Sequence, residues 1–101
     1  MQHAVYAITA LRWRGRGIDQ AMMGLLDTDR MQWDRAPAPA RTSAVIDRLL
    51  EGDTVITLLG DPAHPRRIGP SLKVGVSPEG EETFAEDEAL HPDSLRELPW
   101  F

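Results

Sequence analysis

The chain has 101 residues, a length that predicts a single domain, residues 1–101, with one modest core. Its hydrophobic content of 42% and charged content of 27% are ordinary for a globular protein, and the absence of cysteine excludes disulfides and thiolate metal sites. The longest apolar run, Ala4–Leu11, is much shorter than the roughly 20 residues of a membrane-spanning helix and lacks the flanks of a signal peptide. These features predict a cytoplasmic protein without membrane association.

The formal net charge is −5, but the charges are unevenly distributed. Residues 1–50 carry seven Arg against five Asp, whereas residues 51–101 carry eleven acidic residues against four basic ones. Such asymmetry is typical of a molecule with one basic and one acidic surface. The acidic balance disfavours generic binding to nucleic acid or to a membrane surface, because both require a positive field.

The start of the chain predicts two strands. His3–Arg14 alternates as a strand whose odd-numbered residues share one face and whose even-numbered residues share the other, which places Tyr6 on the side of Arg12 and Arg14. After a glycine-flanked turn, Ile18–Leu26 is compatible with a helix by propensity or with the return arm of a hairpin. An internal glycine and the lack of a preceding cap favour the strand.

A helix is predicted in the middle of the chain. Met31–Trp33 predicts a short extended piece, and the proline-rich stretch Asp34–Ala40 predicts an extended connection without regular structure. Thr42–Glu51 carries an apolar stripe at helical spacing, and the hydroxyl of Thr42 or Ser43 is expected to cap its N-terminus. Gly52 is expected to end this helix in the left-handed conformation.

A hairpin is predicted next, and we expect it to be the central pair of the sheet. Its strands are Thr54–Gly60 and Arg67–Ser77, joined by the proline-bracketed turn Asp61–Pro65. Ser77–Gly80 is a turn signature, and Glu81–Ala85 predicts a last strand. The sequence therefore indicates an α+β fold, an antiparallel sheet of about four to five strands with one main α-helix on one face.

The end of the chain predicts a short C-terminal helical turn followed by two aromatic residues. Ser94–Leu98 would place two leucines on one side, and Pro99 would stop the turn. Trp100 and Phe101 either dock on the body of the protein or contact a partner. The sequence leaves both alternatives open.

Several segments resemble, in order, a bacterial family of small proteins described only as a domain of unknown function. Ile8–Arg12 is similar to the family's opening strand, Ile-Thr-x-Ile-Arg. Trp33 ahead of Val45–Gly52 is similar to its tryptophan and short helix ending in glycine, and Pro92–Pro99 is similar to its closing Leu-x-x-Leu-Pro. Asp93 and the serine after it stand where the family has an asparagine pair. The resemblance implies a compact α+β domain and supplies no catalytic residue.

The sequence predicts no catalytic, cofactor-binding or metal-binding residue. His3, His64 and His91 lack the spacing of a zinc site, and no serine is placed beside a histidine as a nucleophile would require. A solvated turn residue is the favoured interpretation of His64, and a capping role that of His91 and Ser94. We therefore expect no enzyme activity and no cofactor.

The candidate partner surface combines loop arginines with the C-terminal aromatics. It consists of Arg12, Arg14, Arg16, Arg66, Arg67, Trp100 and Phe101. If the loops converge, five guanidinium groups could bind phosphates or an acidic partner; otherwise they are solvated side chains that pair with surplus acids. The sequence predicts a small non-enzymatic binding or regulatory module with another protein as its partner. The alternative is nucleic-acid or phosphate-ligand binding through the five arginines, which the net charge disfavours.

Overall fold

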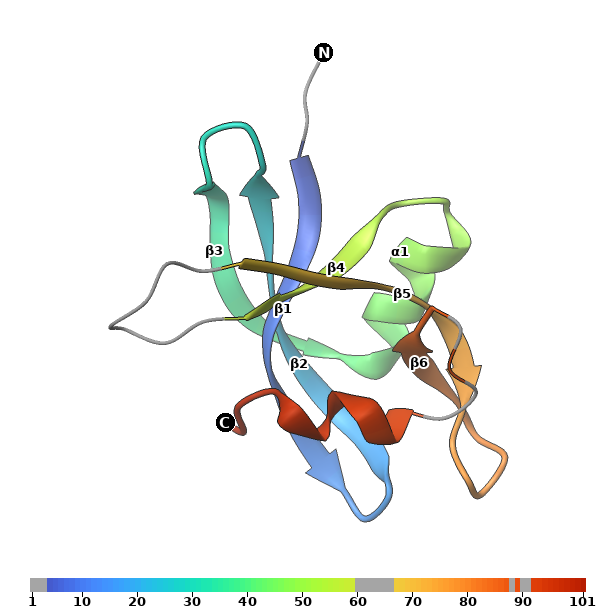
Figure 1. The fold of residues 1–101 in the computed structure, drawn as a ribbon. Helices are drawn as coiled ribbons and strands as arrows, with labels where there is room; N and C mark the ends of the chain where they lie inside the picture. Colours follow the sequence, from blue (N-terminus) through green and yellow to red (C-terminus); the bar gives the residue numbers. More distant parts are fainter. Residues whose placement is uncertain (1–3, 60–66, 88, 90–91) are drawn as a thin grey trace.

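The computed structural model describes residues 4–59, 67–87, 89 and 92–101 (Figure 1). These residues form an α+β fold with one α-helix and six strands. The elements are β1 (Ala4–Arg14), β2 (Gly17–Asp27), β3 (Gln32–Arg41), α1 (Thr42–Leu50), β4 (Val55–Leu59), β5 (Arg67–Val76), β6 (Glu82–Glu86) and the 3-10 helix η1 (Pro92–Glu97). The predicted α+β class and the short C-terminal helical turn are confirmed.

The sheet is mixed, with the strand order β3-β2-β1-β4-β5-β6. Residues 6–8 of β1 pair in parallel with residues 55–57 of β4, and the remaining neighbours are antiparallel. The parallel pair arises because α1 carries the chain back from β3, so that β4 enters in the direction of β1. The prediction of a wholly antiparallel sheet of four to five strands is thus corrected in both respects. The β4–β5 hairpin is not the central pair; β1 and β4 occupy the centre.

The sixth strand comes from the proline-rich stretch that was predicted to be a connection. Asp34–Ala40 lies within β3, which pairs with β2 at the border of the sheet. Proline is compatible with a border strand because only one side of such a strand needs donors for a neighbour. Ile18–Leu26 forms most of β2, which confirms the strand interpretation of that segment.

A one-residue bulge halfway along β1 changes which face of the sheet its side chains point to. Ile8 pairs with Met23 and Ala10 pairs with Met22, which leaves Thr9 without a partner. An unpaired extra residue moves every later side chain of its strand to the opposite face. The strict odd–even alternation predicted for β1 therefore fails beyond Thr9.

The consequence is visible in which side chains are buried together. Leu11 and Trp13 lie in the same buried cluster as Ile8, and Tyr6 packs against it. Arg12 is exposed and therefore lies on the other face, so the prediction that it shares a face with Tyr6 is wrong.

Helix α1 ends as predicted but begins differently. Gly52 has a φ of 91°, its N–H donates to the Leu49 carbonyl (3.1 Å), and the Asp53 N–H donates to the Arg48 carbonyl (3.0 Å). This pair of bonds is the usual glycine-ended stop. At the other end the N-cap residue is Arg41, which makes no side-chain cap hydrogen bond, so the predicted hydroxyl cap is wrong. The Thr42 hydroxyl donates to the carbonyl of Ile18 in β2.

Arg48 fixes the end of α1 to its surroundings. Its guanidinium lies 2.9 Å from the Glu51 carboxylate, 3.3 Å from that of Asp53 and 5.9 Å from the centre of the Tyr6 ring. Hydrogen bonding with Tyr6, followed by the charge of Glu51, raises the pKa of Arg48 above its ordinary value. The guanidinium of Arg48 is therefore engaged in contacts within the protein.

Strand β5 is shared between two neighbours. Its first half, from Arg67 to Ser71, pairs with β4, and its second half, from Leu72 to Val76, pairs with β6. The predicted turn after it is confirmed, because Gly80 has a φ of 86° and its N–H donates to the Ser77 carbonyl (2.9 Å).

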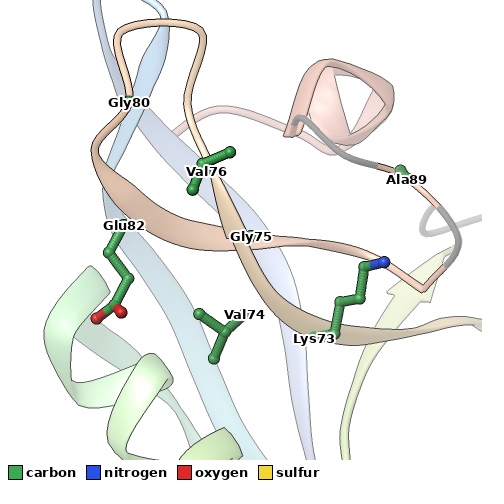
Figure 2. Close-up of a pocket in the computed structure, with 7 residues that line it drawn as sticks. All are labelled: Lys73, Val74, Gly75, Val76, Gly80, Glu82 and Ala89. Atoms are coloured by element: carbon green, nitrogen blue, oxygen red, sulfur yellow. The ribbon is translucent and has the colours of Figure 1, made fainter.

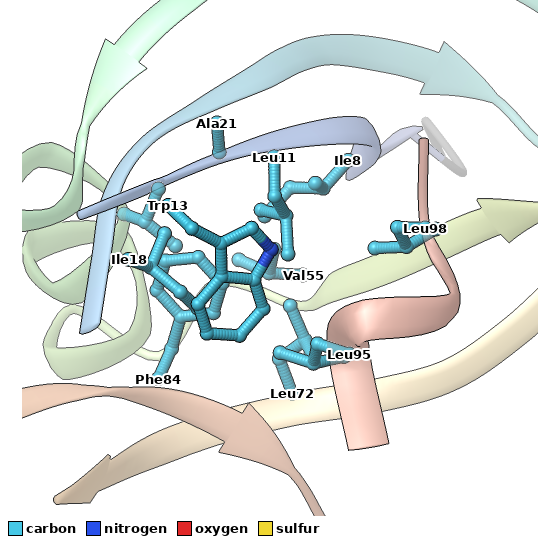
Figure 3. Close-up of a cluster of buried hydrophobic side chains, with 11 residues drawn as sticks. Ile8, Leu11, Trp13, Ile18, Ala21, Val55, Leu72, Phe84, Leu95 and Leu98 are labelled. Carbon is cyan, nitrogen blue, oxygen red and sulfur yellow. The ribbon is translucent and has the colours of Figure 1, made fainter. Parts of the chain in front are cut away.

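The main core lies between one face of the sheet, α1, the β5–β6 hairpin and η1. Figure 3 shows the Trp13 ring among Ile18, Phe84 and Leu95. The buried members of this cluster are Ile8, Leu11, Trp13, Ile18, Ala21, Val45, Val55, Leu72, Phe84, Leu95 and Leu98. A smaller cluster on the other side of the sheet consists of Ala7, Leu26, Ile56 and Leu58, with Val5 and Trp33 against it.

Candidate binding surface

Three adjacent strands place two arginines in one row across the sheet. Arg12 of β1 pairs with Gln20 of β2, and Gln20 pairs in turn with Arg41 of β3. Paired residues of neighbouring strands point to the same face, and the strands lie about 4.8 Å apart, so the backbones of the two arginines are roughly 10 Å apart. Arg14 follows on this face two residues after Arg12, and Arg16 lies in the turn after it. All four arginines are exposed, and together they are named the basic end of the sheet.

The basic end differs from the predicted arginine set in its membership. Arg66 lies outside the described residues, and Arg67 begins β5, which starts well away from the β1–β2 turn (Figure 1). The structure therefore does not bring Arg67 to Arg14 and Arg16. Arg41 takes part instead. It was missed because it lies between the predicted connection Asp34–Ala40 and the predicted helix Thr42–Glu51, and only the pairing of β3 with β2 reveals its position.

The last three residues pair with β1 beside the place where β4 ends. The Leu11 N–H donates to the Pro99 carbonyl (2.8 Å), and the Phe101 N–H donates to the Leu11 carbonyl (3.3 Å). Trp100 thus stands opposite Leu11 as a parallel neighbour. Its backbone is fixed by these bonds, yet its side chain is 63% exposed.

Arg12 connects this C-terminal segment to the basic end. Its Nε donates to the Phe101 carbonyl (3.1 Å), and its guanidinium lies 4.7 Å from the centre of the Phe101 ring. Both contacts hold the segment in place, the second through the attraction of a cation to an aromatic face. The two C-terminal aromatics therefore differ in their environment. Phe101 is half-buried and held by Arg12, and Trp100 faces solvent.

A second arginine–aromatic contact lies at the same end of the molecule. The Arg96 guanidinium of η1 lies 4.0 Å from the centre of the Trp13 ring, and its Nη2 donates to the Gly15 carbonyl (3.4 Å). Trp13 is only 8% exposed, so Arg96 covers the outer side of a core residue. These contacts fasten η1 to the β1–β2 turn.

An open cleft of about 560 Å³ lies beside the basic end. It brings together charged side chains from three segments that are distant in the sequence. Its lining residues are Arg14, Ile18, Asp19, Gln20, Arg41, Thr42, Ser43, Glu81 and Glu82. Sequence reasoning did not predict this cleft, because it forms only where the start of β6 approaches the junction of β3 and α1.

A second hollow, of about 470 Å³, lies over the β5–β6 hairpin (Figure 2). It is lined mainly by small and apolar residues, with Lys73 and Glu82 as its charged members. Figure 2 shows the Glu82 side chain directed toward α1. This hollow offers no group of reactive side chains.

The described residues contain no group of three or more His, Asp or Glu side chains that could hold a metal ion. The three histidines fall outside these residues. What the surface offers chemically is a set of guanidinium groups, which bind carboxylates and phosphates through paired N–H donors, next to an exposed indole.

Comparison of the chain with models of known protein families, with curated protein sequences and with solved structures finds no match. Among the described helices, none is long and apolar enough to cross a bilayer.

Proposed function

We propose that the protein is a small non-enzymatic binding module whose partner is another protein, contacted by Trp100, Phe101 and the basic end of the sheet. The observation that supports this proposal most directly is Trp100, whose backbone is paired with β1 while its side chain is 63% exposed. Tryptophan and arginine are the side chains that contribute most to binding energy at protein interfaces. A pre-ordered tryptophan also loses little conformational entropy on binding.

The charges at this end favour an acidic partner segment. Arg14 and Arg16 are exposed and follow Arg12, which contacts Phe101, and a carboxylate-bearing chain would complement them. The net charge of −5 disfavours nucleic acid as the partner, since a polyanion is repelled by the rest of the molecule. The resemblance to a bacterial family of unknown function stays a prediction and adds no partner.

Comparing wild-type and Trp100→Ala chains tests the proposal. Each is immobilised, the proteins that it retains from a cell extract are quantified, and each retained protein is purified for titration calorimetry. We expect Trp100→Ala to weaken binding by about tenfold or more, which is the typical cost of removing a dominant interface side chain. Arg16→Glu should weaken it further, because it places an acid opposite an acidic partner.

Leu50→Ala is the matched control, since Leu50 is also a large exposed side chain (68%) but lies at the end of α1. An unchanged thermal midpoint for all variants shows that the fold is intact. Equal binding by the Trp100→Ala and Leu50→Ala chains would contradict the proposal.

Nucleic-acid or phosphate-ligand binding is the second candidate, and the row of Arg12 and Arg41 across the strands is the observation that favours it. Anisotropy of labelled single-stranded and duplex DNA distinguishes it from the first. Affinity that falls steeply with salt and is lost in Arg16→Glu would support this candidate, because phosphate neutralisation releases counterions. The absence of binding at low ionic strength would reject it.

A further inference from the structure

We propose that the cleft between the β1–β2 turn, the start of α1 and the start of β6 binds a small zwitterionic molecule of the α-amino acid class. This inference goes beyond the proposed function, because it concerns a small ligand and makes no use of Trp100 or Phe101. It rests on the charges that line the cleft, on their origins in the fold and on the cleft's size.

Five charged side chains line the cleft without neutralising one another. Arg14 and Arg41 are its cations, and Asp19, Glu81 and Glu82 are its anions. Within the described ranges, none of these five side chains is in an ion pair. Their capacity for charge-assisted hydrogen bonds is therefore available to a ligand.

The two signs of charge enter the cleft from different elements. The arginines come from the end of β1 and the end of β3, and Asp19 comes from β2 between them. Glu81 directly precedes β6, and Glu82 is its first residue. Figure 2 shows the Glu82 side chain directed toward α1, whose first residues Thr42 and Ser43 belong to the same lining. A ligand in the cleft would thus meet both cations and Asp19 from the sheet and the two glutamates from the hairpin.

This arrangement selects against ligands of a single sign. Three carboxylates and two guanidiniums give a net charge of −1, so a simple anion is repelled overall and a simple cation leaves both guanidiniums without a partner. A molecule with one carboxylate and one ammonium can place each group against its opposite. Arg14 or Arg41 can hold the carboxylate through two parallel N–H donors, and Glu81 or Glu82 can accept from the ammonium.

The size of the cleft agrees with a small ligand. Its volume of about 560 Å³ lies within the usual range for small-molecule sites. Because the cleft is open and its charged walls remain in contact with water, the contacts are screened, and we expect a dissociation constant on the order of 1 mM.

Heteronuclear NMR titration of the full chain with glycine tests the proposal. N-acetylglycine keeps the carboxylate and removes the ammonium, whereas glycinamide keeps the ammonium and removes the carboxylate. We expect glycine to shift the amide signals of Gln20, Ser43 and Glu82 with saturation, and each half-ligand to bind at least tenfold more weakly. Inorganic phosphate should also bind at least tenfold more weakly than glycine. Equal binding of N-acetylglycine, glycinamide or phosphate, or no saturable shift with glycine, would overturn the proposal.

Variants locate the site and distinguish it from Trp100 and Phe101, although Arg14 and Arg41 belong both to the cleft and to the basic end of the sheet. Arg41→Gln and Glu82→Gln should each weaken glycine binding by at least tenfold, whereas Arg35→Gln and Glu79→Gln, which alter exposed residues outside the cleft, should leave it unchanged. Trp100→Ala should also leave it unchanged, so either proposal can fail while the other stands. Loss of binding in Arg35→Gln to the same extent as in Arg41→Gln would reject this location.

Discussion

Gly24 controls how closely β2 and β3 approach each other. A Cβ atom at this position would lie 2.7 Å from the Arg35 carbonyl oxygen, 2.8 Å from Cζ3 of Trp33 and 2.9 Å from the Pro37 nitrogen. Two of these atoms belong to the backbone and cannot move without shifting β3. The packing of Trp33 over the sheet therefore requires glycine at position 24. From the sequence alone, this glycine was only an argument against a helix.

We expect Gly24→Ala to lower the free energy of unfolding by about 1–3 kcal/mol, the usual cost of overpacking a well-packed site. Urea denaturation of the two chains measures it. Gly17→Ala is the control, because the nearest atom to its added Cβ would be the Arg14 carbonyl oxygen at an ordinary 3.8 Å. Equal effects of the two substitutions would contradict this account of Gly24.

The site residues show how far single positions could be predicted. Arg12, Arg14 and Arg16 were found from their spacing, since a strand followed by a tight turn keeps them together. Arg41 could not be found in this way, because its place beside Gln20 depends on a strand pairing that leaves no trace in local spacing. The contact of Arg12 with Phe101 joins residues 89 positions apart and has no local signal either.

Among the elements, η1 contributes more to the core than its short length suggests. Leu95 of η1 is 1% exposed and Leu98, directly after η1, is 3% exposed, and both belong to the main cluster with Phe84 and Leu72. The 3-10 helix thus closes one side of the core, and the contact of Arg96 with Trp13 holds it there.

Leu95→Ala should therefore lower the free energy of unfolding by about 2–5 kcal/mol, as expected for a fully buried leucine. Leu50→Ala, at a side chain that is 68% exposed, should change it by less than about 0.5 kcal/mol. Chemical denaturation followed by tryptophan fluorescence compares them. A small effect of Leu95→Ala would mean that η1 is not part of the cooperative unit.

Elements with their own local signals were predicted well, and those defined by a neighbour were not. The end of α1 at Gly52 and the turn at Ser77–Gly80 were predicted because each needs a glycine with positive φ, and a glycine stands at each position in the sequence. The bulge at Thr9 could not be predicted in this way, because both faces of β1 are apolar there and the alternation of residue types does not reveal it. The prediction that Asp34–Ala40 is a connection was wrong for a related reason. An alanine–proline repeat favours extended backbone both in a connection and in a border strand.

At the scale of the whole molecule, the sheet consists of two three-stranded antiparallel units joined by the parallel pair β1 and β4. One unit contains β1, β2 and β3, the other β4, β5 and β6. The joining pair lies in the middle, with Ala7 fully buried and Val55 1% exposed, and a bond from the Tyr6 N–H to the Thr54 carbonyl (3.1 Å) extends it. Opening this pair would separate the two units, so it requires global unfolding.

Native-state hydrogen exchange should therefore be slowest in the centre of β1 and β4. We expect the amides of Ala7, Ile8 and Ile56 to exchange only through global unfolding, whereas those of β3 and β6, at the two borders, exchange through local opening. NMR detection of exchange under mild denaturant measures both. Slower exchange in β6 than in β1 would contradict this assignment of the centre.

The composition of the two border strands has a consequence for the protein at high concentration. In β3, Pro37 and Pro39 lack the N–H groups that a second chain would need in order to extend the sheet. At the opposite border β6 is only five residues long, and it begins and ends with Glu82 and Glu86, so identical strands laid side by side would repel each other. We therefore expect neither border to act as a template for fibril growth, and the exposed side chain of Trp100 does not lie on either border strand.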